Sequence, residues 1–444
     1  MRKHSTTRVG LAAALLLGLG LVINGCTIDK PVEPDLSLGT LDATSFVALG
    51  NSLTAGVVSG GLGGATQANS FPALLAAQLG VTTFAQPTIS EPGIPNKLEV
   101  QLLGGNNVIV AMSGTGAPTN STYASAYNNL AVPGANTVDF LTDDGSTAAT
   151  IGQVVLRGLG TAITQAGTLS PTLLWCWIGA NDVLGGAVYG QIANGVTTVP
   201  SAVTTSNIAT IFALLDATGA DVVVANVPDV TALPYVTYLT KGFTSPLTNA
   251  AGVQTVFPVI TTGVGAVRQA TADDYLLLPA ATTLAVDATY GGPTNPISDA
   301  HTLDADEVTE LQSRITAMNT AIATQATAIG ATLVDAYSMF NNLATFGVAG
   351  ITEGGNDYAF NALFVSDGGM VMSLDGVHPS TTGYTYVANK VIDELNTEFG
   401  ASIPHISYAG VTFPRVAPGK IPLDRMPDYT LLQQRLMEMY RVDR

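Results

Sequence analysis

The sequence predicts an α/β protein, a three-layer α/β/α sandwich around a doubly wound and mostly parallel sheet. Short apolar runs alternate along the chain with longer amphipathic runs. This is the order that parallel strands joined by crossover helices require. The apolar runs do not alternate between apolar and polar residues, which is typical of strands buried on both faces.

Four apolar runs are predicted to form the strands of this sheet. Each is bounded by glycine, proline or polar residues, as strands usually are. The runs are 46–49, 172–178, 221–227 and 331–337. Ligands of doubly wound sheets bind beyond the carboxyl ends of the strands, so residues that follow these runs are the first candidates for a functional site.

Five segments are predicted to be helices. They are 70–79, 151–166, 204–219, 305–329 and 380–399. The clearest is 305–329, in which Val308, Leu311 and Ile315 begin a series of apolar residues at helical spacing. Acidic residues at the start of this segment suit the positive end of a helix dipole.

Two long stretches fit the alternating pattern poorly and are predicted to be insertions. Residues 85–128 and 231–303 are rich in Gly, Thr, Pro and Ala and have no strong helical period. We expect extra strands or lids there. The main domain is predicted to span 45–400, with an extension over 401–444 that contains a short helix near 429–440.

The N-terminal segment has the pattern of a bacterial secretion signal. Three basic residues precede an apolar run, 9–23, which is too short for a spanning helix. The run ends in Ile-Asn-Gly-Cys, which resembles a lipobox. The resemblance implies that residues 1–25 are removed, that Cys26 is diacylated and anchors the protein in a membrane, and that 26–44 form a tether. Thr27 after Cys26 implies an outer-membrane address in the cell envelope, facing the periplasm or the cell surface. An ordinary signal peptide with an incidental cysteine is the alternative.

Charge and cysteine usage limit the partners of the mature chain. Removing the leader takes the formal charge from −17 to −20, which excludes nucleic acid as a partner. Cys176 has no partner once Cys26 is acylated, so we predict a buried free thiol in an apolar run.

A serine follows the first predicted strand in the turn Gly50-Asn51-Ser52. Where a strand turns into a helix, a serine presents its hydroxyl to a cleft and keeps its backbone N–H free for an oxyanion. Such a turn is also common as a simple connection. After the second predicted strand, Asn181 offers an uncharged amide donor, and Asp182 is expected to support that loop.

The most specific pattern is Asp375-x-x-His378-Pro379. It should arise by chance in roughly one such chain in a hundred. The spacing lets one carboxylate reach the imidazole Nδ1–H, which fixes the tautomer while Nε2 accepts a proton from a hydroxyl. His301 and His405 lack a carboxylate at this spacing and are predicted to be ordinary surface residues.

Taken in chain order, these residues resemble four sequence blocks of the SGNH, or GDSL-type, hydrolase family. The matching segments are 50–54 for block I, 129–137 for block II, 177–182 for block III and 375–380 for block V. Asn51 stands where the family usually has Asp, which questions the stability of the loop more than the mechanism. The resemblance implies a flavodoxin-like fold with a five-stranded sheet.

The same resemblance implies a set of site residues. Ser52 would be the nucleophile, His378 the base and Asp375 its carboxylate partner. The oxyanion hole would consist of the N–H groups of Ser52 and Gly134 and the side-chain amide of Asn181. Neither a cofactor nor a metal is implied, and the sequence has no His-Glu-x-x-His, Cys-x-x-Cys or EF-hand pattern.

The implied function is that of a serine esterase or lipase which cleaves a small-molecule or lipid ester through an acyl-enzyme on Ser52. Two alternatives stay open. One is a carbohydrate acetylesterase of the same fold, with sugar-stacking aromatic candidates at Tyr123, Tyr127, Tyr235 and Tyr358. The other is a non-catalytic surface lipoprotein.

Overall fold

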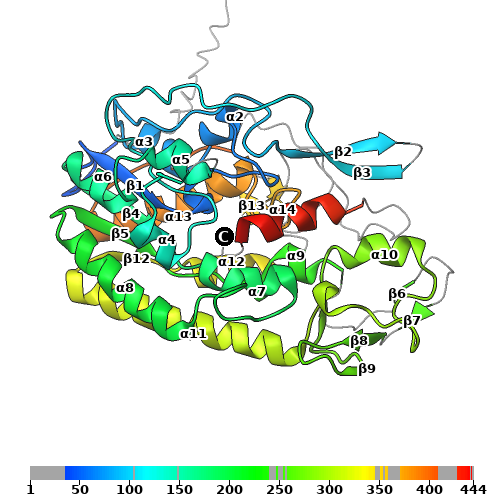
Figure 1. Ribbon diagram of the computed structural model, residues 1–444. Coiled ribbons are helices and arrows are strands. Elements are labelled where there is room, and N and C mark those ends of the chain that lie inside the picture. Colours follow the sequence, from blue (N-terminus) through cyan, green and yellow to red (C-terminus); the bar gives the residue numbers. More distant parts are fainter. Residues whose placement is uncertain are drawn as a thin grey trace, which may run out of the picture. The chain divides into compact units, whose positions relative to one another are not determined.

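The centre of the computed structural model is a parallel sheet with the strand order β1-β4-β5-β12 (Figure 1). Its strands are β1 (Phe46–Gly50), β4 (Leu173–Trp177), β5 (Asp221–Ala225) and β12 (Thr332–Val334). All neighbouring pairs are parallel. The four predicted strands and the fold class are confirmed.

The structure describes only part of the chain. It covers residues 36–103, 106–147, 150–239, 247–248, 254–255, 258–345, 351–353, 356–358, 371–408, 428–440 and 442. The leader and the lipidation site predicted at Cys26 lie outside the described residues. Within these ranges, no helix is long and apolar enough to cross a membrane.

The edge of the sheet beside β1 differs from the five strands that the family resemblance implied. The chain at 128–132 runs along β1, where Leu130 N–H donates to the Ala48 carbonyl at 2.9 Å and Val132 N–H donates to that of Gly50 at 3.0 Å. Only one parallel bridge, between Ala48 and Asn129, forms there in the described chain. Pro133 and Gly134 then turn the chain away, so this edge stays a fragment of a strand.

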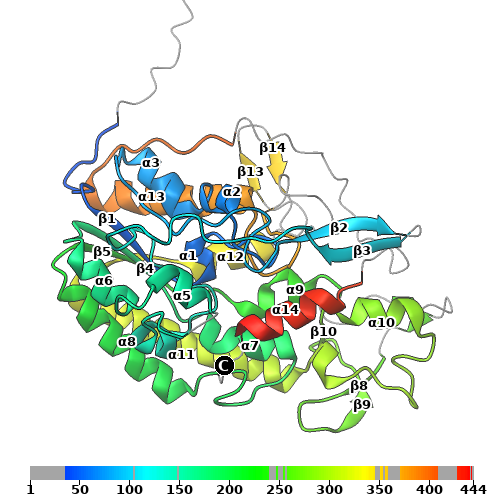
Figure 2. The same cartoon turned by 45° about the horizontal axis from the view of Figure 1, so that its top comes forward.

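Helices cover both faces of the sheet (Figures 1 and 2). One face carries α8 (Ser201–Asp216) and α11 (Ala305–Ile329), and the other carries α3 (Phe71–Gln78) and α13 (Thr381–Phe399). Helix α11 begins where predicted because Asp304 accepts from Asp306 N–H and Glu307 N–H, both at 3.0 Å. This capping box satisfies backbone groups that a helix start leaves unpaired.

One predicted helix is wrong. The segment 151–166 forms two helices, α5 (Ile151–Leu156) and α6 (Ala162–Thr168). The break lies at Arg157 and Gly158, which have φ angles of +60° and +72°. A left-handed backbone ends a helix, and a glycine adopts it without strain.

The two predicted insertions form small elements of their own. In 85–128, strands β2 (Leu98–Leu103) and β3 (Asn106–Ala111) make a hairpin that extends away from the sheet (Figure 2). The described part of 231–303 contains short pieces: η1 (Val230–Ala232), α9 (Pro234–Thr237), β6 (Leu247–Thr248), β7 (Gln254–Thr255), β8 (Val259–Thr261), β9 (Val267–Gln269), β10 (Tyr275–Leu276), α10 (Ala280–Val286), η2 (Asp299–His301) and β11 (Thr302–Leu303).

The remaining elements lie around the ends of the strands and near the C-terminus. They are α1 (Ser52–Ala55), α2 (Gly64–Gln67), α4 (Thr137–Thr142), α7 (Asn181–Tyr189), α12 (Ala336–Thr345), β13 (Ile351–Glu353), β14 (Asn356–Tyr358) and α14 (Thr430–Tyr440). Helix α14 confirms the short helix predicted near 429–440.

Both predicted domain boundaries need correction. The folded part begins before Ser45, because Ser37 and Ser402 pair through backbone hydrogen bonds and Leu41 is 5% exposed. The segment after residue 400 also belongs to the fold. The described residues from Leu36 onward form one compact unit. The last residues of the predicted tether and the described part of the extension are therefore components of the domain.

Candidate active site

Ser52 stands at the first position of α1, directly after β1. The turn depends on Gly50, since a Cβ there would lie 2.6 Å from the Trp177 carbonyl oxygen. Asn51 caps α1 by accepting from Leu53 N–H at 3.1 Å. A helix start leaves its first N–H groups without partners inside the helix, so this turn can present a hydroxyl and an N–H on the same side.

Asp375 and His378 form a fully buried pair. The carboxylate Oδ2 lies 2.7 Å from His378 Nδ1, and both residues are 0% exposed. The same carboxylate accepts from the backbone N–H groups of Val377 at 2.9 Å and His378 at 2.8 Å. Burial alone would raise the pKa of Asp375, but the charge on His378 and these hydrogen bonds hold that pKa below its usual value. The predicted partnership is therefore present in its expected geometry.

Asn181 stands at the first position of α7, directly after the turn that follows β4. Its Nδ2 donates one hydrogen to the Ala135 carbonyl at 2.8 Å, which leaves the second amide hydrogen for a ligand. Gly134 precedes Ala135 in the loop that Asn181 contacts, and its φ of +80° suits a glycine. Gly134 itself does not line the pocket described next.

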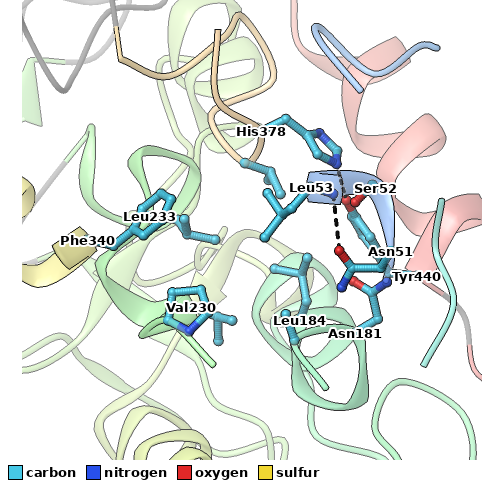
Figure 3. Close-up of a pocket in the computed structure, with 13 residues that line it drawn as sticks. Asn51, Ser52, Leu53, Asn181, Leu184, Val230, Leu233, Phe340, His378 and Tyr440 are labelled. Atoms are coloured by element: carbon cyan, nitrogen blue, oxygen red, sulfur yellow. Dashed lines mark hydrogen bonds between the residues drawn. The ribbon is translucent and has the colours of Figure 1, made fainter. Parts of the chain in front are cut away.

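One pocket brings the candidate residues together (Figure 3). Ser52, Asn181 and His378 all line it, although they come from widely separated parts of the chain. The space between its walls is about 370 Å³, including the part that is open to solvent. Most of the remaining wall is apolar, and consists of Leu53, Ala180, Leu184, Pro228, Val230, Leu233, Phe340 and Val377. The pocket thus combines a hydroxyl, an imidazole and an amide with an apolar chamber.

Asn51 also lines this pocket and carries a buried amide nitrogen without a hydrogen-bond partner in the described part of the chain. The Asn51 Oδ1 atom accepts from Leu53 N–H, so the other atom of the amide group is the nitrogen Nδ2. An Asp at this position would place an acceptor where Asn51 places a donor. Asn51 nevertheless caps α1 through Oδ1, as a carboxylate oxygen of Asp could. The replacement of the family's usual Asp by Asn therefore keeps the hydrogen bond that stabilises this loop.

Asp182 supports the loop, as predicted, and lies outside the pocket lining. Its carboxylate accepts from Thr137 N–H at 2.9 Å, Thr137 Oγ1 at 2.6 Å and Thr204 Oγ1 at 2.7 Å. These contacts tie the start of α7 to α4 and α8. Burial raises the pKa of Asp182 to about 6.

Replacing Asp182 by alanine is expected to lower the free energy of unfolding by about 2–4 kcal/mol, because three donors lose their acceptor inside the protein. Chemical denaturation followed by circular dichroism measures this loss. Asp182→Asn keeps the shape and one acceptor oxygen and should lose less. Equal stability of the alanine variant and the wild type would contradict the supporting role.

Sequence reasoning missed several residues that contact the Asp375–His378 pair, among them Gly60 and Tyr440. Gly60 N–H donates to Asp375 Oδ2 at 2.7 Å, and Tyr440 Oη lies 2.9 Å from His378 Nε2. Gly60 belongs to a loop that pairs with the first insertion through Leu62 and Ile94. The sequence around Tyr440 shows apolar residues at helical spacing. This pattern predicts that the helix packs on the protein but does not indicate which residue Tyr440 contacts.

The other sequence candidates fall outside the pocket. Tyr127 and Tyr235 are 0% and 1% exposed, so neither offers a surface for a sugar. Tyr123 is 37% exposed and stacks on Tyr127, and the side chain of Tyr358 lies outside the described residues.

Cys176 is buried and unpaired as predicted, and burial raises the pKa of its thiol to about 12. Among the described residues, no group of three or more His, Cys, Asp or Glu could hold a metal ion.

The sequence matches one family of known proteins. The family described as GDSL-like Lipase/Acylhydrolase matches residues 46–391. No curated protein matches the chain.

Several solved structures are similar. LAE5, an α/β hydrolase from the metagenome of Lake Arreo, is 12% identical, with 80% of this chain and 96% of that chain covered and a TM-score of 0.35. A mutant of Axe2, an acetylxylan esterase from Geobacillus stearothermophilus, is 11% identical, with 81% and 97% covered and a TM-score of 0.32. Phospholipase A1 from Streptomyces albidoflavus is 14% identical, with 80% and 100% covered and a TM-score of 0.30.

Proposed function

The chain belongs to the GDSL-like lipase/acylhydrolase family of ester-hydrolysing enzymes, and we propose that it is a serine esterase or lipase which forms an acyl-enzyme on Ser52. One observation carries this proposal. His378 lines the same pocket as Ser52 and Asn181, and behind it the Asp375 carboxylate contacts its Nδ1 at 2.7 Å. A non-catalytic protein would have no need to keep an ion-pairing carboxylate and an imidazole fully buried beside a serine.

The proposed reaction proceeds by two acyl transfers. Ser52 Oγ attacks the ester carbonyl and gives its proton to His378 Nε2, which passes it to the departing alcohol. The oxyanion is bound by the N–H groups of Ser52 and Gly134 and by the second amide hydrogen of Asn181. Water, deprotonated by His378, then attacks the acyl-enzyme and releases the carboxylic acid, and His378 returns the proton to Ser52.

The pocket wall favours an aliphatic acyl group over an acetyl group on a sugar. Leu184, Leu233 and Phe340 belong to a mostly apolar lining that can remove an alkyl chain from water. The two buried tyrosines described above offer no stacking surface for a sugar ring. We therefore propose a lipid or small aliphatic ester as the substrate, with the carbohydrate acetylesterase as the alternative that the next experiment separates.

Nitrophenyl esters of increasing acyl length test this substrate class. We expect kcat/KM to rise from acetate to butyrate and hexanoate, by about fourfold for each methylene that is buried, since a buried methylene contributes about 0.8 kcal/mol. An acetylated xylo-oligosaccharide serves as the competing substrate. Highest kcat/KM on acetyl groups would contradict the aliphatic proposal and favour the acetylesterase.

We also propose that the mature protein is held in the outer membrane of the cell envelope by acylation of Cys26. The support is the lipobox-like sequence at 23–26 and the basic, apolar leader before it. Metabolic labelling with an alkyne fatty acid, compared between the wild type and Cys26→Ala, tests the anchor. Equal labelling of both proteins would contradict it.

A further inference from the structure

Helix α14 brings a second hydroxyl to the imidazole that Ser52 needs. Tyr440 Oη lies 2.9 Å from His378 Nε2, and Tyr440 is 1% exposed. The Asp375 carboxylate can only accept, so His378 Nδ1 carries a hydrogen, and in the neutral imidazole that acts as a base Nε2 holds the lone pair. Tyr440 therefore donates to the lone pair that has to receive the proton of Ser52 during catalysis.

Tyr440 and Ser52 thus compete for one acceptor. In the described part of the chain, the hydrogen bond to His378 Nε2 comes from Tyr440, and Ser52 Oγ makes none (Figure 3). A neutral imidazole has a single acceptor nitrogen. The arrangement is that of a resting site, because the base cannot deprotonate Ser52 until Tyr440 has left it.

Helix α14 is held in this position by an apolar face and a few hydrogen bonds. Leu432, Leu436 and Tyr440 are spaced four residues apart and are at most 1% exposed. Tyr189 of the neighbouring helix α7 donates to the Met437 carbonyl at 2.8 Å. The helix lies beside α7 in both views (Figures 1 and 2).

Helix α14 also forms a wall between two cavities. Tyr440 lines the pocket that contains Ser52, and Arg435, Glu438 and Met439 line a neighbouring cavity together with Val57. Val57 follows shortly after Ser52 in the chain, and its N–H donates to the Ser52 carbonyl at 3.1 Å. Movement of α14 would remove the partition and leave one continuous groove beside Ser52.

We propose that α14 is a lid carried on the same chain, and that Tyr440 inhibits the enzyme in the closed state by occupying His378 Nε2. This proposal rests on the proposed function of Ser52 and His378. Opening frees the imidazole for Ser52 and lets an ester enter the joined groove. An apolar acyl chain then covers the apolar surface that the inward face of α14 covered in the closed state.

Tyr440→Phe tests the competition without changing the shape of the lid. A fluorophosphonate probe reports the reactivity of Ser52, and we expect labelling and kcat/KM to increase about two- to tenfold, the range that one net hydrogen bond accounts for. Tyr429→Phe is the matched control. Tyr429 is also fully buried, and its hydroxyl has no hydrogen-bond partner among the described residues, so its removal should leave both rates unchanged.

A reversible lock tests whether α14 must move. Val442 N–H donates to the Val196 carbonyl at 2.8 Å. Two residues joined in this way have Cα atoms close enough for a disulfide, which spans a Cα–Cα separation of about 4.4–6.8 Å. In the full-length Val196→Cys, Val442→Cys variant, oxidation should slow labelling of Ser52 at least tenfold, and a reductant should restore it. Each single-cysteine variant should be indifferent to the reductant.

The outcomes separate the lid from the catalytic proposal. Labelling of Ser52 that is slower in Tyr440→Phe would make the hydroxyl a catalytic aid, and an unchanged rate would show that it does not compete; either result overturns the lid. Equal labelling of the oxidised and reduced pair overturns it as well. If Ser52 is labelled in no form of the protein, the nucleophile itself is refuted, and the lid falls with it.

Discussion

Ser52→Ala is expected to abolish ester hydrolysis, with turnover reduced about 10⁴- to 10⁶-fold, because it removes the hydroxyl on which the proposed acyl-enzyme forms. The hydroxyl of Ser52 makes no hydrogen bond within the described residues, so its loss should leave the fold unchanged. Steady-state hydrolysis of a nitrophenyl butyrate and labelling by a fluorophosphonate measure the effect together.

Ser70→Ala provides the matched control for this experiment. Ser70 is also buried and precedes helix α3, but it does not line the pocket. Its variant should label and hydrolyse like the wild type. Appreciable turnover by Ser52→Ala in a folded sample would transfer the role of nucleophile to another residue and end the proposed mechanism.

Asp375→Asn is expected to lower kcat by about 10⁴-fold through the tautomer of His378. The Asp375 Oδ1 faces the backbone N–H groups of Val377 and His378, which will hold the oxygen of the new amide. The amide nitrogen must then face His378 Nδ1. Since that nitrogen donates, Nδ1 has to accept, and the hydrogen moves to Nε2, where it blocks proton uptake from Ser52.

Ser373→Ala separates this effect from a general loosening of the loop. Ser373 Oγ donates to Asp375 Oδ1 at 3.2 Å, and its removal leaves the carboxylate in place. We expect less than a tenfold loss of kcat, with some loss of stability. A similar kcat for Asp375→Asn and Ser373→Ala would show that the carboxylate does not set the tautomer.

The central layers of the fold could be predicted because their signals are local. Each strand of the sheet contains consecutive apolar residues, and α11 begins at a capping box that is visible in the sequence. The same reasoning failed at 151–166, where Gly158 and Gly160 interrupt an apolar pattern and the chain turns left-handed. There the glycines were a better guide than the periodicity.

The members of the candidate site could be predicted because each follows a strand or precedes a helix in a short pattern. Ser52, Asn181 and His378 meet because a doubly wound sheet gathers such turns at one edge. Gly60 and Tyr440 could not be found in this way. The contact of Gly60 joins residues more than 300 positions apart and that of Tyr440 joins residues more than 60 apart, and neither residue type indicates a role at the site by itself.

The domain boundaries were misjudged for a related reason. Residues 37–44 contain Pro-free, mixed polar sequence without a period, and only their pairing with the chain near Ser402 orders them. Pairing between the two ends of a domain has no local signature. The C-terminal tail also lacks a local signature for its role, because Tyr440 reaches His378 only through the fold.

The position of the indole side chains gives this protein a built-in optical reporter. The chain has two tryptophans, and both, Trp175 and Trp177, lie on β4 with 1% exposure. The ring of Trp177 is 6.2 Å from that of Phe340, a pocket residue. All tryptophan emission therefore originates from the central sheet, so a red shift during denaturation records the opening of that sheet and is blind to melting of the insertions or of α14.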